Sequence, residues 1–307
     1  MASPVRIVAQ GEIARGSPEP PAIRLPKAES VFAERGARLR ALAARGHPSA
    51  DFLRLIAAIA DAQQAALAAH PGVADPPAER QELARTHGMP PLSIEEERDP
   101  AWRDALSAVV ERVAATAPEA VLPVLHRLQH ESPEGLEVAA TDLLGANYPN
   151  VDAAAAPFLA AALQVHWVKR AAKLGAQAFA RLDVPNVCPV CGSPALAGVL
   201  RVDVPAPGTR YLHCALCETE WLLPRGQCSN CEAREKVSYL HPEGASEAVK
   251  AEACDECKTY LKIFNAEKDP LLDPIADDLA TLALDVALDE SGYERGGPNL
   301  FFIPGRA

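Results

Sequence analysis

The sequence of 307 residues contains no run of about 18 consecutive apolar residues, the length that a transmembrane helix requires. Residues 1–21 also contain neither an apolar core of about seven residues nor a pair of adjacent arginines, features of export signals. We therefore expect a cytoplasmic protein that is not inserted into a membrane.

Positive charge is also scarce. The chain has 30 Lys and Arg against 41 Asp and Glu, which gives a formal net charge of −11 and a pI near 5.3. Nucleic-acid binding depends on neutralising phosphates with Lys and Arg. DNA and RNA are therefore not expected as partners.

Recognisable catalytic motifs are missing as well. The sequence has no phosphate-binding glycine loop, no Gly-x-Ser-x-Gly elbow and no motif of paired carboxylates. We predict that the protein is not an enzyme.

Cysteine is absent from every part of the chain except residues 188–257, where it forms four Cys-x-x-Cys pairs. Thiols stay reduced in the cytoplasm, so cysteines concentrated in this way indicate metal or redox chemistry rather than structural disulfides. A lone Cys-x-x-Cys beside a βαβ pattern, as in thioredoxin, is not present. The candidate metal ligands are Cys188, Cys191, Cys214, Cys217, Cys228, Cys231, Cys254 and Cys257.

The first four cysteines recur 40 residues later as the last four, so the segment is a tandem repeat that predicts two equivalent sites. Sequential pairing places one ion in each copy, and a cross-braced arrangement is the alternative. Four thiolates at about 2.3 Å form a tetrahedron that suits iron or Zn²⁺. We expect two metal ions per chain, with rubredoxin-type iron favoured and zinc as the alternative.

The residues that follow each pair differ. Cys188 to Gly192 has the Cys-Pro-x-Cys-Gly form of rubredoxins and zinc ribbons, in which glycine permits a positive φ after the turn. The other three pairs are followed by Glu218, Glu232 and Lys258. His213, beside Cys214, is expected at the surface, because four cysteines already complete the coordination shell.

Helical periodicity and capping residues organise the rest of the chain. Apolar spacing predicts helices over 30–44 and 49–70, with Ser30 and Ser49 as N-caps. Further helices are expected to begin at Asp99, Ser132 and Asp152. A last helix is predicted from Asp273 to Gly292.

These patterns predict a multi-domain α+β protein. We expect an all-α domain followed by two rubredoxin-like or zinc-ribbon-like Cys₄ modules and a C-terminal helix that packs back on the body. The predicted parts are an extended arm at 1–28, the helical domain at 29–182, the modules at 183–227 and 228–268, and the C-terminal part at 269–307.

The chain resembles the FdhE family of formate dehydrogenase accessory proteins. The tandem pairs and the Cys-x-x-Cys-x-x-x-Trp run from Cys214 to Trp221 carry the resemblance, together with the segments 31–48, 51–63 and 277–293. The resemblance implies a cytoplasmic maturation factor that binds the formate dehydrogenase catalytic subunit, with the eight cysteines holding rubredoxin-like iron.

Two other hypotheses compete with this one. The first is a rubredoxin-type electron carrier or reductase acting on the cofactor of a partner. The second is a transcription-linked zinc ribbon, which the charge opposes, because residues 183–265 hold 11 acidic and 8 basic side chains. In each case, the metal ions could instead serve only to stabilise small modules that have little core.

Overall fold

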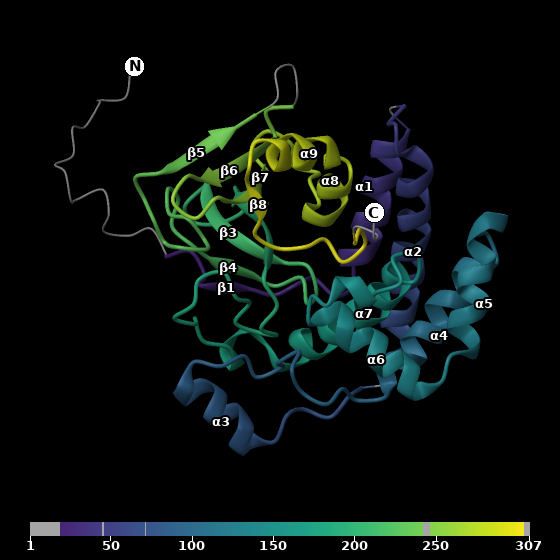
Figure 1. The fold of residues 1–307 in the computed structure, drawn as a ribbon. Coiled ribbons are helices and arrows are strands. Elements are labelled where there is room, and N and C mark those ends of the chain that lie inside the picture. The colour runs from purple at the N-terminus through teal and green to yellow at the C-terminus, as the bar shows by residue number, and fades with distance from the viewer. Residues whose placement is uncertain (1–18, 45, 71, 242–245, 304–307) are drawn as a thin grey trace, which may run out of the picture.

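The computed structural model describes residues 19–44, 46–70, 72–241 and 246–303. Residues 1–18 of the predicted arm and residues 304–307 of the predicted C-terminal part lie outside the described residues. Figure 1 shows a helical region beside a β-sheet, with α8 and α9 returning between them. The predicted combination of a helical N-terminal region and a sheet-rich region with two Cys₄ clusters is confirmed.

The helical region is built around a helix that is buried on every side. All residues of α7 from Ala156 to Val168 are buried, and α2, α4 and α6 contact this helix. A helix with apolar residues around its whole circumference belongs inside a domain. The helices here are α1 (Val31–Ala43), α2 (Ala50–Ala69), α3 (Ala78–His87), α4 (Ala101–Ala114), α5 (Leu122–His130), α6 (Pro133–Leu144) and α7 (Ala156–Leu174), with 3-10 turns at Glu119–Val121, Tyr148–Asn150 and Ala176–Ala178.

Helix starts follow the predicted capping residues only in part. The Ser132 hydroxyl accepts a hydrogen bond from Gly135 N at 3.0 Å, and Asp99 accepts one from Ala101 N at 2.9 Å. Ser30 and Ser49 occupy the predicted N-cap positions of α1 and α2, but their side chains accept no capping hydrogen bond. Gln64 of α2 instead accepts hydrogen bonds from the first N–H groups of α1, a long-range solution that local sequence does not reveal.

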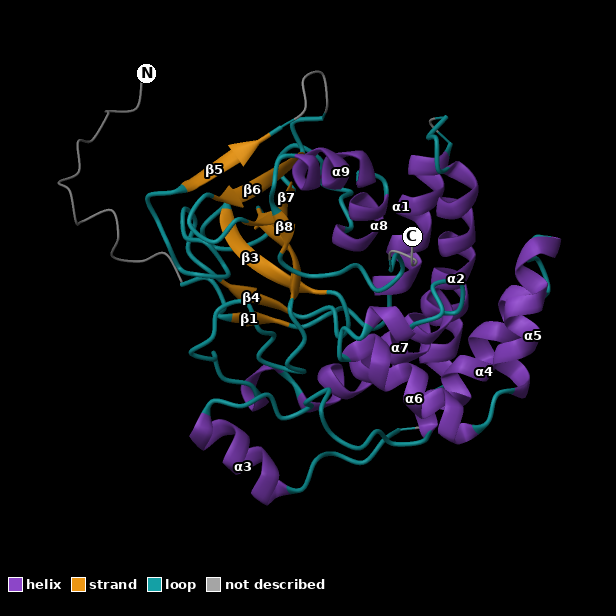
Figure 2. Ribbon diagram, viewed as in Figure 1, coloured by secondary structure: helices purple, strands orange, loops and turns teal. Residues whose placement is uncertain are grey.

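The described strands form one eight-stranded sheet, in the order β1-β4-β3-β2-β7-β6-β5 with β8 beside β7. Figure 2 shows the strands gathered on one side of the protein, with most of the helices on the other. Strands β2, β3 and β4 come from the first repeat copy, and β5, β6 and β7 from the second. The strands are β1 (Ile23–Arg24), β2 (Ala195–Arg201), β3 (Thr209–Cys214), β4 (Glu220–Leu222), β5 (Val237–Leu240), β6 (Val249–Cys254), β7 (Thr259–Asn265) and β8 (Glu294–Arg295).

The two repeat copies lie side by side because β2 and β7 pair in parallel, from Ala197 opposite Lys262 to Leu200 opposite Asn265. A buried ion pair supports the same junction, in which Arg210 Nη2 of β3 lies 2.9 Å from Glu252 Oε1 of β6. The hairpins of the two copies are therefore parts of one continuous sheet.

The predicted C-terminal helix is two shorter helices, α8 (Pro274–Leu279) and α9 (Leu282–Glu290). Lys262 of β7 lies at the break, where its ammonium group donates to the carbonyl oxygens of Asp278 and Thr281 at 3.2 and 3.1 Å. An uninterrupted helix would use these carbonyls for its own hydrogen bonds. The prediction of a single helix from Asp273 to Gly292 was therefore wrong.

One hydrophobic core joins the parts. It includes residues of α2, α4 and α7, the four cysteines of the first repeat copy, strands β6 and β7, and Phe301 near the C-terminus. Within the described residues, α2 is the one helix whose length and mean hydropathy of 1.3 would suit a membrane span, and 50% of that window is buried. It packs against α1, α4 and α7 and carries Asp51, Arg54 and Asp61, as an interior helix of a folded domain can.

Candidate metal centres

The structure collects the eight cysteines into two groups of four, and each group comes from one repeat copy. In the first centre, Cys188 Sγ lies 3.5 Å from Cys217 Sγ, and Cys191 Sγ lies 3.5 Å from Cys214 Sγ. The corresponding distances in the second centre, formed by Cys228, Cys231, Cys254 and Cys257, are 3.7 and 3.6 Å. The arrangement follows the sequential pairing and not the cross-braced one.

The donor set and spacing fit a tetrahedral metal ion. The four sulfurs of each group lie within 4.8 Å of one another, and four thiolates at about 2.3 Å from a central ion have this separation. Two Cys₄ groups could therefore hold two metal ions. The chemistry that a bound ion supplies is that of a tetrathiolate centre, which is structural for zinc and also redox-active for iron.

Backbone amides point at the sulfurs from the tight turns. Leu216 N and Cys217 N donate to Cys214 Sγ at 3.4 and 3.5 Å, and Asn230 N donates to Cys228 Sγ at 3.4 Å. Such hydrogen bonds stabilise the negative charge of a thiolate. The turn geometry thus prepares the sulfurs to act as ligands.

A positive φ follows the second cysteine of all four pairs. Gly192 has φ of 81°, and Glu218, Glu232 and Lys258 have φ of 60°, 62° and 57°. The turn geometry typical of Cys-x-x-Cys-Gly is therefore kept at three positions without glycine, where an L-residue pays about 1–2 kcal/mol for this conformation.

Glu218 uses the left-handed conformation to reach a buried arginine of the helical region. Its Oε2 lies 2.6 Å from Arg35 Nη2, and both side chains are at most 1% exposed. Arg35 also pairs with Asp273 at 3.1 Å, just before α8. One residue next to the first centre thus connects the sheet, α1 and the C-terminal part. Local sequence reasoning missed Arg35 because 183 positions separate it from Glu218.

His213 lies in the same buried group, so the expectation of a surface position was wrong. It is 4% exposed, and its Nε2 lies 3.2 Å from Glu218 Oε2. Burial opposes its protonation, but the adjacent carboxylates of Glu218 and Glu220 favour the protonated ring and raise its pKa to about 9. A cavity of about 370 Å³ lies between the sheet, α1 and the start of α8. His213, Glu218 and Glu220 are among the residues that line it.

Burial makes four thiolates in the first centre unfavourable unless a cation is present. Burial raises the pKa of the thiols of Cys188, Cys214 and Cys217 well above the usual value. At Cys191 burial acts in the same direction, but hydrogen bonds from neighbouring side chains outweigh it and lower the pKa. A divalent cation stabilises the thiolate form and releases the protons on binding. We therefore expect the buried thiols of the first centre to lose their protons when a metal ion binds.

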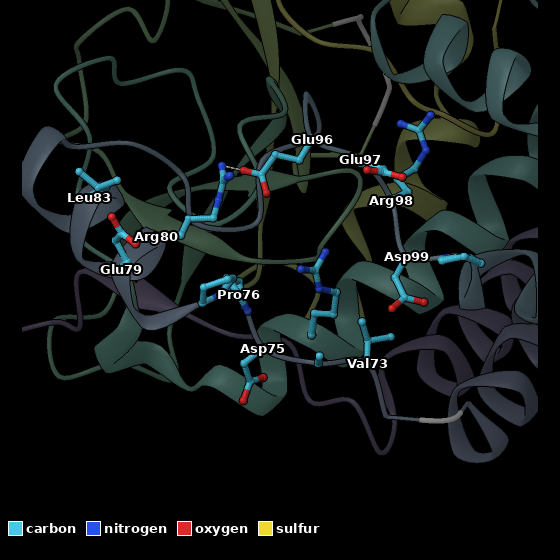
Figure 3. A pocket seen from close by; sticks show the side chains of 14 residues that line it. Val73, Asp75, Pro76, Glu79, Arg80, Leu83, Glu96, Glu97, Arg98 and Asp99 are labelled. Atoms are coloured by element: carbon cyan, nitrogen blue, oxygen red, sulfur yellow. Dashed lines mark ion pairs between the residues drawn. The ribbon is translucent and has the colours of Figure 1, made fainter.

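A larger cavity lies elsewhere. It measures about 640 Å³ and lies beside α3, and Figure 3 shows charged side chains around it, with Arg80 and Glu96 in contact. Its lining contains no cysteine. The metal centres and this cavity are thus separate features.

Comparisons with known proteins agree along nearly the whole chain. Family models described as "FdhE, N-terminal", "FdhE, central domain" and "FdhE, C-terminal domain" match residues 20–183, 187–225 and 227–302. "Protein FdhE homolog" of Edwardsiella ictaluri is 42% identical over 92% of this chain and 91% of that protein. "Protein FdhE" of Escherichia coli K12 is 38% identical over 98% of both chains.

A solved structure is similar too. The crystal structure of the FdhE protein from Pseudomonas aeruginosa superposes with a TM-score of 0.84 at 40% sequence identity. The match covers 93% of this chain and 100% of that one. The arrangement of helical region, sheet and C-terminal helices is therefore shared with a known protein over most of its length.

Proposed function

The chain belongs to the FdhE family, and from this membership we propose that it is a non-catalytic accessory protein required for formate dehydrogenase activity. It acts in the cytoplasm on the catalytic subunit before that enzyme is complete. The observation that carries the proposal is family similarity along nearly the whole chain, in matched ranges that contain both cysteine clusters.

All eight cysteines serve as metal ligands in this proposal, four to each ion. The ions hold the sheet region in the shape that a client recognises, and the helical region supplies the rest of the binding surface. Iron is the proposed metal, as the family resemblance implies, and the Cys₄ groups with their N–H···S hydrogen bonds fit a tetrathiolate centre. Elemental analysis of protein purified without added metal tests this part, with two iron ions per chain expected and one or none contradicting it.

The accessory role is tested in a strain from which the gene has been deleted. Formate dehydrogenase activity should be lost in that strain and restored by the intact chain. It should also be restored by the control variant Ser107→Ala, which alters an exposed hydroxyl on α4. A variant with Cys188→Ser and Cys228→Ser should not restore activity or retain the catalytic subunit in a pull-down. Normal activity in the deletion strain would remove the proposal.

A second candidate function is electron transfer to the cofactor of a partner. The amide hydrogen bonds to cysteine sulfur favour it, because such bonds set the reduction potential of iron–thiolate centres. Reversible bleaching of visible absorption on reduction would support this function. A protein that contains only zinc would exclude it.

A further inference from the structure

The two metal centres differ in their access to solvent. All four cysteines of the first centre are 0% exposed. In the second centre, Cys231 is exposed and Cys257 is half-buried, while Cys228 and Cys254 are buried. The repeat therefore has equivalent ligands but unequal surroundings.

A segment from the helical region covers the first centre. Leu92 N donates to Val190 O at 3.0 Å, and Ile94 N donates to Cys191 O at 2.9 Å. Trp167 of α7 fixes the segment from the other side, because its Nε1 donates to Leu92 O at 2.8 Å. We call residues 90–94 the covering segment. They close the first centre at the turn that carries Cys188 and Cys191.

Glycine makes this close approach possible. A Cβ added at Gly192 would lie 3.2 Å from Pro90 Cγ, tighter than ordinary van der Waals contact. The position 40 residues later holds Glu232, whose side chain is exposed. A second covering segment could not pack against that turn in the same way.

The second centre has no such cover in the described structure. Asn230 and Cys231 correspond to Val190 and Cys191, and both are exposed where their counterparts are buried. Among the described residues, no backbone N–H donates to the carbonyl oxygen of Asn230 or Cys231. Cys231 is thus the most exposed of the eight candidate ligands and the one most open to an external group.

We propose that the second centre is a ligand-exchange site, at which an incoming thiolate replaces Cys231 on the metal ion, whereas the first centre is closed to exchange by the covering segment. In the exchange, the bond between the metal and Cys231 Sγ breaks and a bond to the external sulfur forms. Cys231 leaves as a solvated thiolate, and no electron is transferred. The inference rests on the proposed function only in that both clusters bind metal.

The physical basis is the path that the incoming group must follow. At Cys231 the attacking sulfur comes from water and the leaving sulfur is hydrated as it departs. At the first centre, an incoming thiolate would have to be desolvated in the core, which is costly for a charge without a partner. Opening that path requires loss of the hydrogen bonds that Leu92 and Ile94 make to the turn.

Zinc release from the full-length chain after both centres have been loaded with zinc tests the proposal. Glutathione is the incoming thiol, and pyridylazoresorcinol in excess captures and reports the released metal. One equivalent should leave at a rate that increases with glutathione concentration, and the second at least about tenfold more slowly. In a parallel sample, brief treatment with iodoacetamide followed by peptide mass spectrometry should find Cys231 modified first.

Three variants identify the sites. Cys231→Ser should remove the fast, glutathione-dependent phase and leave the slow one. Leu92→Ala, at a residue of the covering segment that is 0% exposed, should accelerate the slow phase and leave the fast phase unchanged. The matched control is Leu125→Ala, at an equally buried leucine of α5, which should change neither phase.

The outcomes separate this proposal from the one on which it rests. A chain that binds no metal would overturn metal binding itself. Two equivalents released at one rate would overturn the inequality of the centres while leaving metal binding intact. The proposal would also be overturned by a fast phase that persists in Cys231→Ser, or by equal acceleration in Leu92→Ala and Leu125→Ala.

Discussion

Three residues that follow the cysteine pairs have the same left-handed backbone but different surroundings. Glu232 is exposed, and its carboxylate accepts one hydrogen bond from Gln227. Glu218 is buried against Arg35. The same substitution to glycine should therefore have opposite effects at these two positions.

Glu232→Gly should stabilise the metal-loaded protein by up to about 1 kcal/mol. Relief of the left-handed strain, about 1–2 kcal/mol, outweighs the added flexibility of the unfolded chain and the loss of one exposed hydrogen bond. Urea unfolding of the loaded protein measures the change. A clear loss of stability would contradict the interpretation that position 232 is strained.

Glu218→Gly should destabilise the protein by about 3–5 kcal/mol, because it leaves the Arg35 guanidinium buried with only Asp273 as its charged partner. Burial opposes the charge of Arg35, but Asp273 and Glu218 raise its pKa well above the ordinary value. Because an arginine guanidinium is not deprotonated in proteins, Arg35 stays charged when Glu218 is removed. Equal effects of the two glycine substitutions would show that the ion pair contributes nothing.

His166 of α7 should make stability fall in acid. Burial, with Arg170 and His70 acting in the same direction and Asp99 opposing, lowers its pKa from 6.5 to about 3. The unfolded chain then binds the proton more tightly, so stability is unaffected above pH 6.5 and decreases as the pH falls from 6.5 toward 3. At pH 5 the loss from this group is about 2 kcal/mol.

The comparison with His166→Leu isolates this effect. The variant should lose less stability than the wild type when urea unfolding is repeated at pH 7 and pH 5. Protonation of the cysteine ligands weakens metal binding in both proteins and so does not enter the difference. Identical losses would contradict the prediction.

At the scale of secondary structure, the sequence patterns predicted the features that depend on contacts between residues close together in the chain. The Cys-x-x-Cys spacing predicted how the eight sulfurs are grouped, because the two cysteines of each pair lie in one tight turn. Ser132 and Asp99 were found as caps because they bond to N–H groups two or three residues away. By contrast, Gln64 of α2 accepts a hydrogen bond from the start of α1. Lys262 of β7 donates a hydrogen bond to Asp278 O, where the predicted last helix is broken. Both contacts join residues that are far apart in the sequence.

Long-range packing also explains why the two centres have unequal surroundings, which the repeat in the sequence did not predict. Equal cysteine spacing predicted two equivalent sites, but in the described residues the covering segment bonds to the metal-binding turn of the first copy and not to that of the second. The difference depends on residues 90–94, which are far from both copies in the sequence. Neither periodicity nor composition indicates such a contact.

The C-terminal segment gives a prediction at this scale. A Cβ at Gly297 would overlap the carbonyl oxygen of Ala195 at the start of β2. Gly297→Ala should therefore displace the segment from the sheet and destabilise the protein by about 2 kcal/mol or more. Gly72→Ala is the matched control, because nothing lies within 4 Å of its added Cβ, and it should be neutral or slightly stabilising.

Thermal unfolding and limited proteolysis compare the two alanine variants. Gly297→Ala should lower the melting temperature and expose the chain after α9 to cleavage. A wild-type melting temperature for Gly297→Ala would mean that the segment does not pack on β2 as described.

For the whole molecule, the continuity of the core determines which metal ion supports which part. The cysteines of the first centre belong to the hydrophobic core that also contains α2, α4 and α7, whereas none of the second centre's cysteines does. Loss of the first ion would leave four buried thiols at the junction of the helices and the sheet. Loss of the second would affect mainly β5 and the turns around Cys231 and Cys257.

Hydrogen exchange on two serine variants should therefore differ in extent. Cys257→Ser should raise exchange in residues 228–240 and leave α2 and α7 protected. Cys188→Ser should raise exchange across the covering segment and α7 as well, and lower the global free energy of unfolding, because an emptied first centre no longer holds the turn to which Leu92 and Ile94 bond. If both variants lost protection only within their own repeat copies, the shared core would contribute nothing to coupling, and helices and sheet would unfold independently.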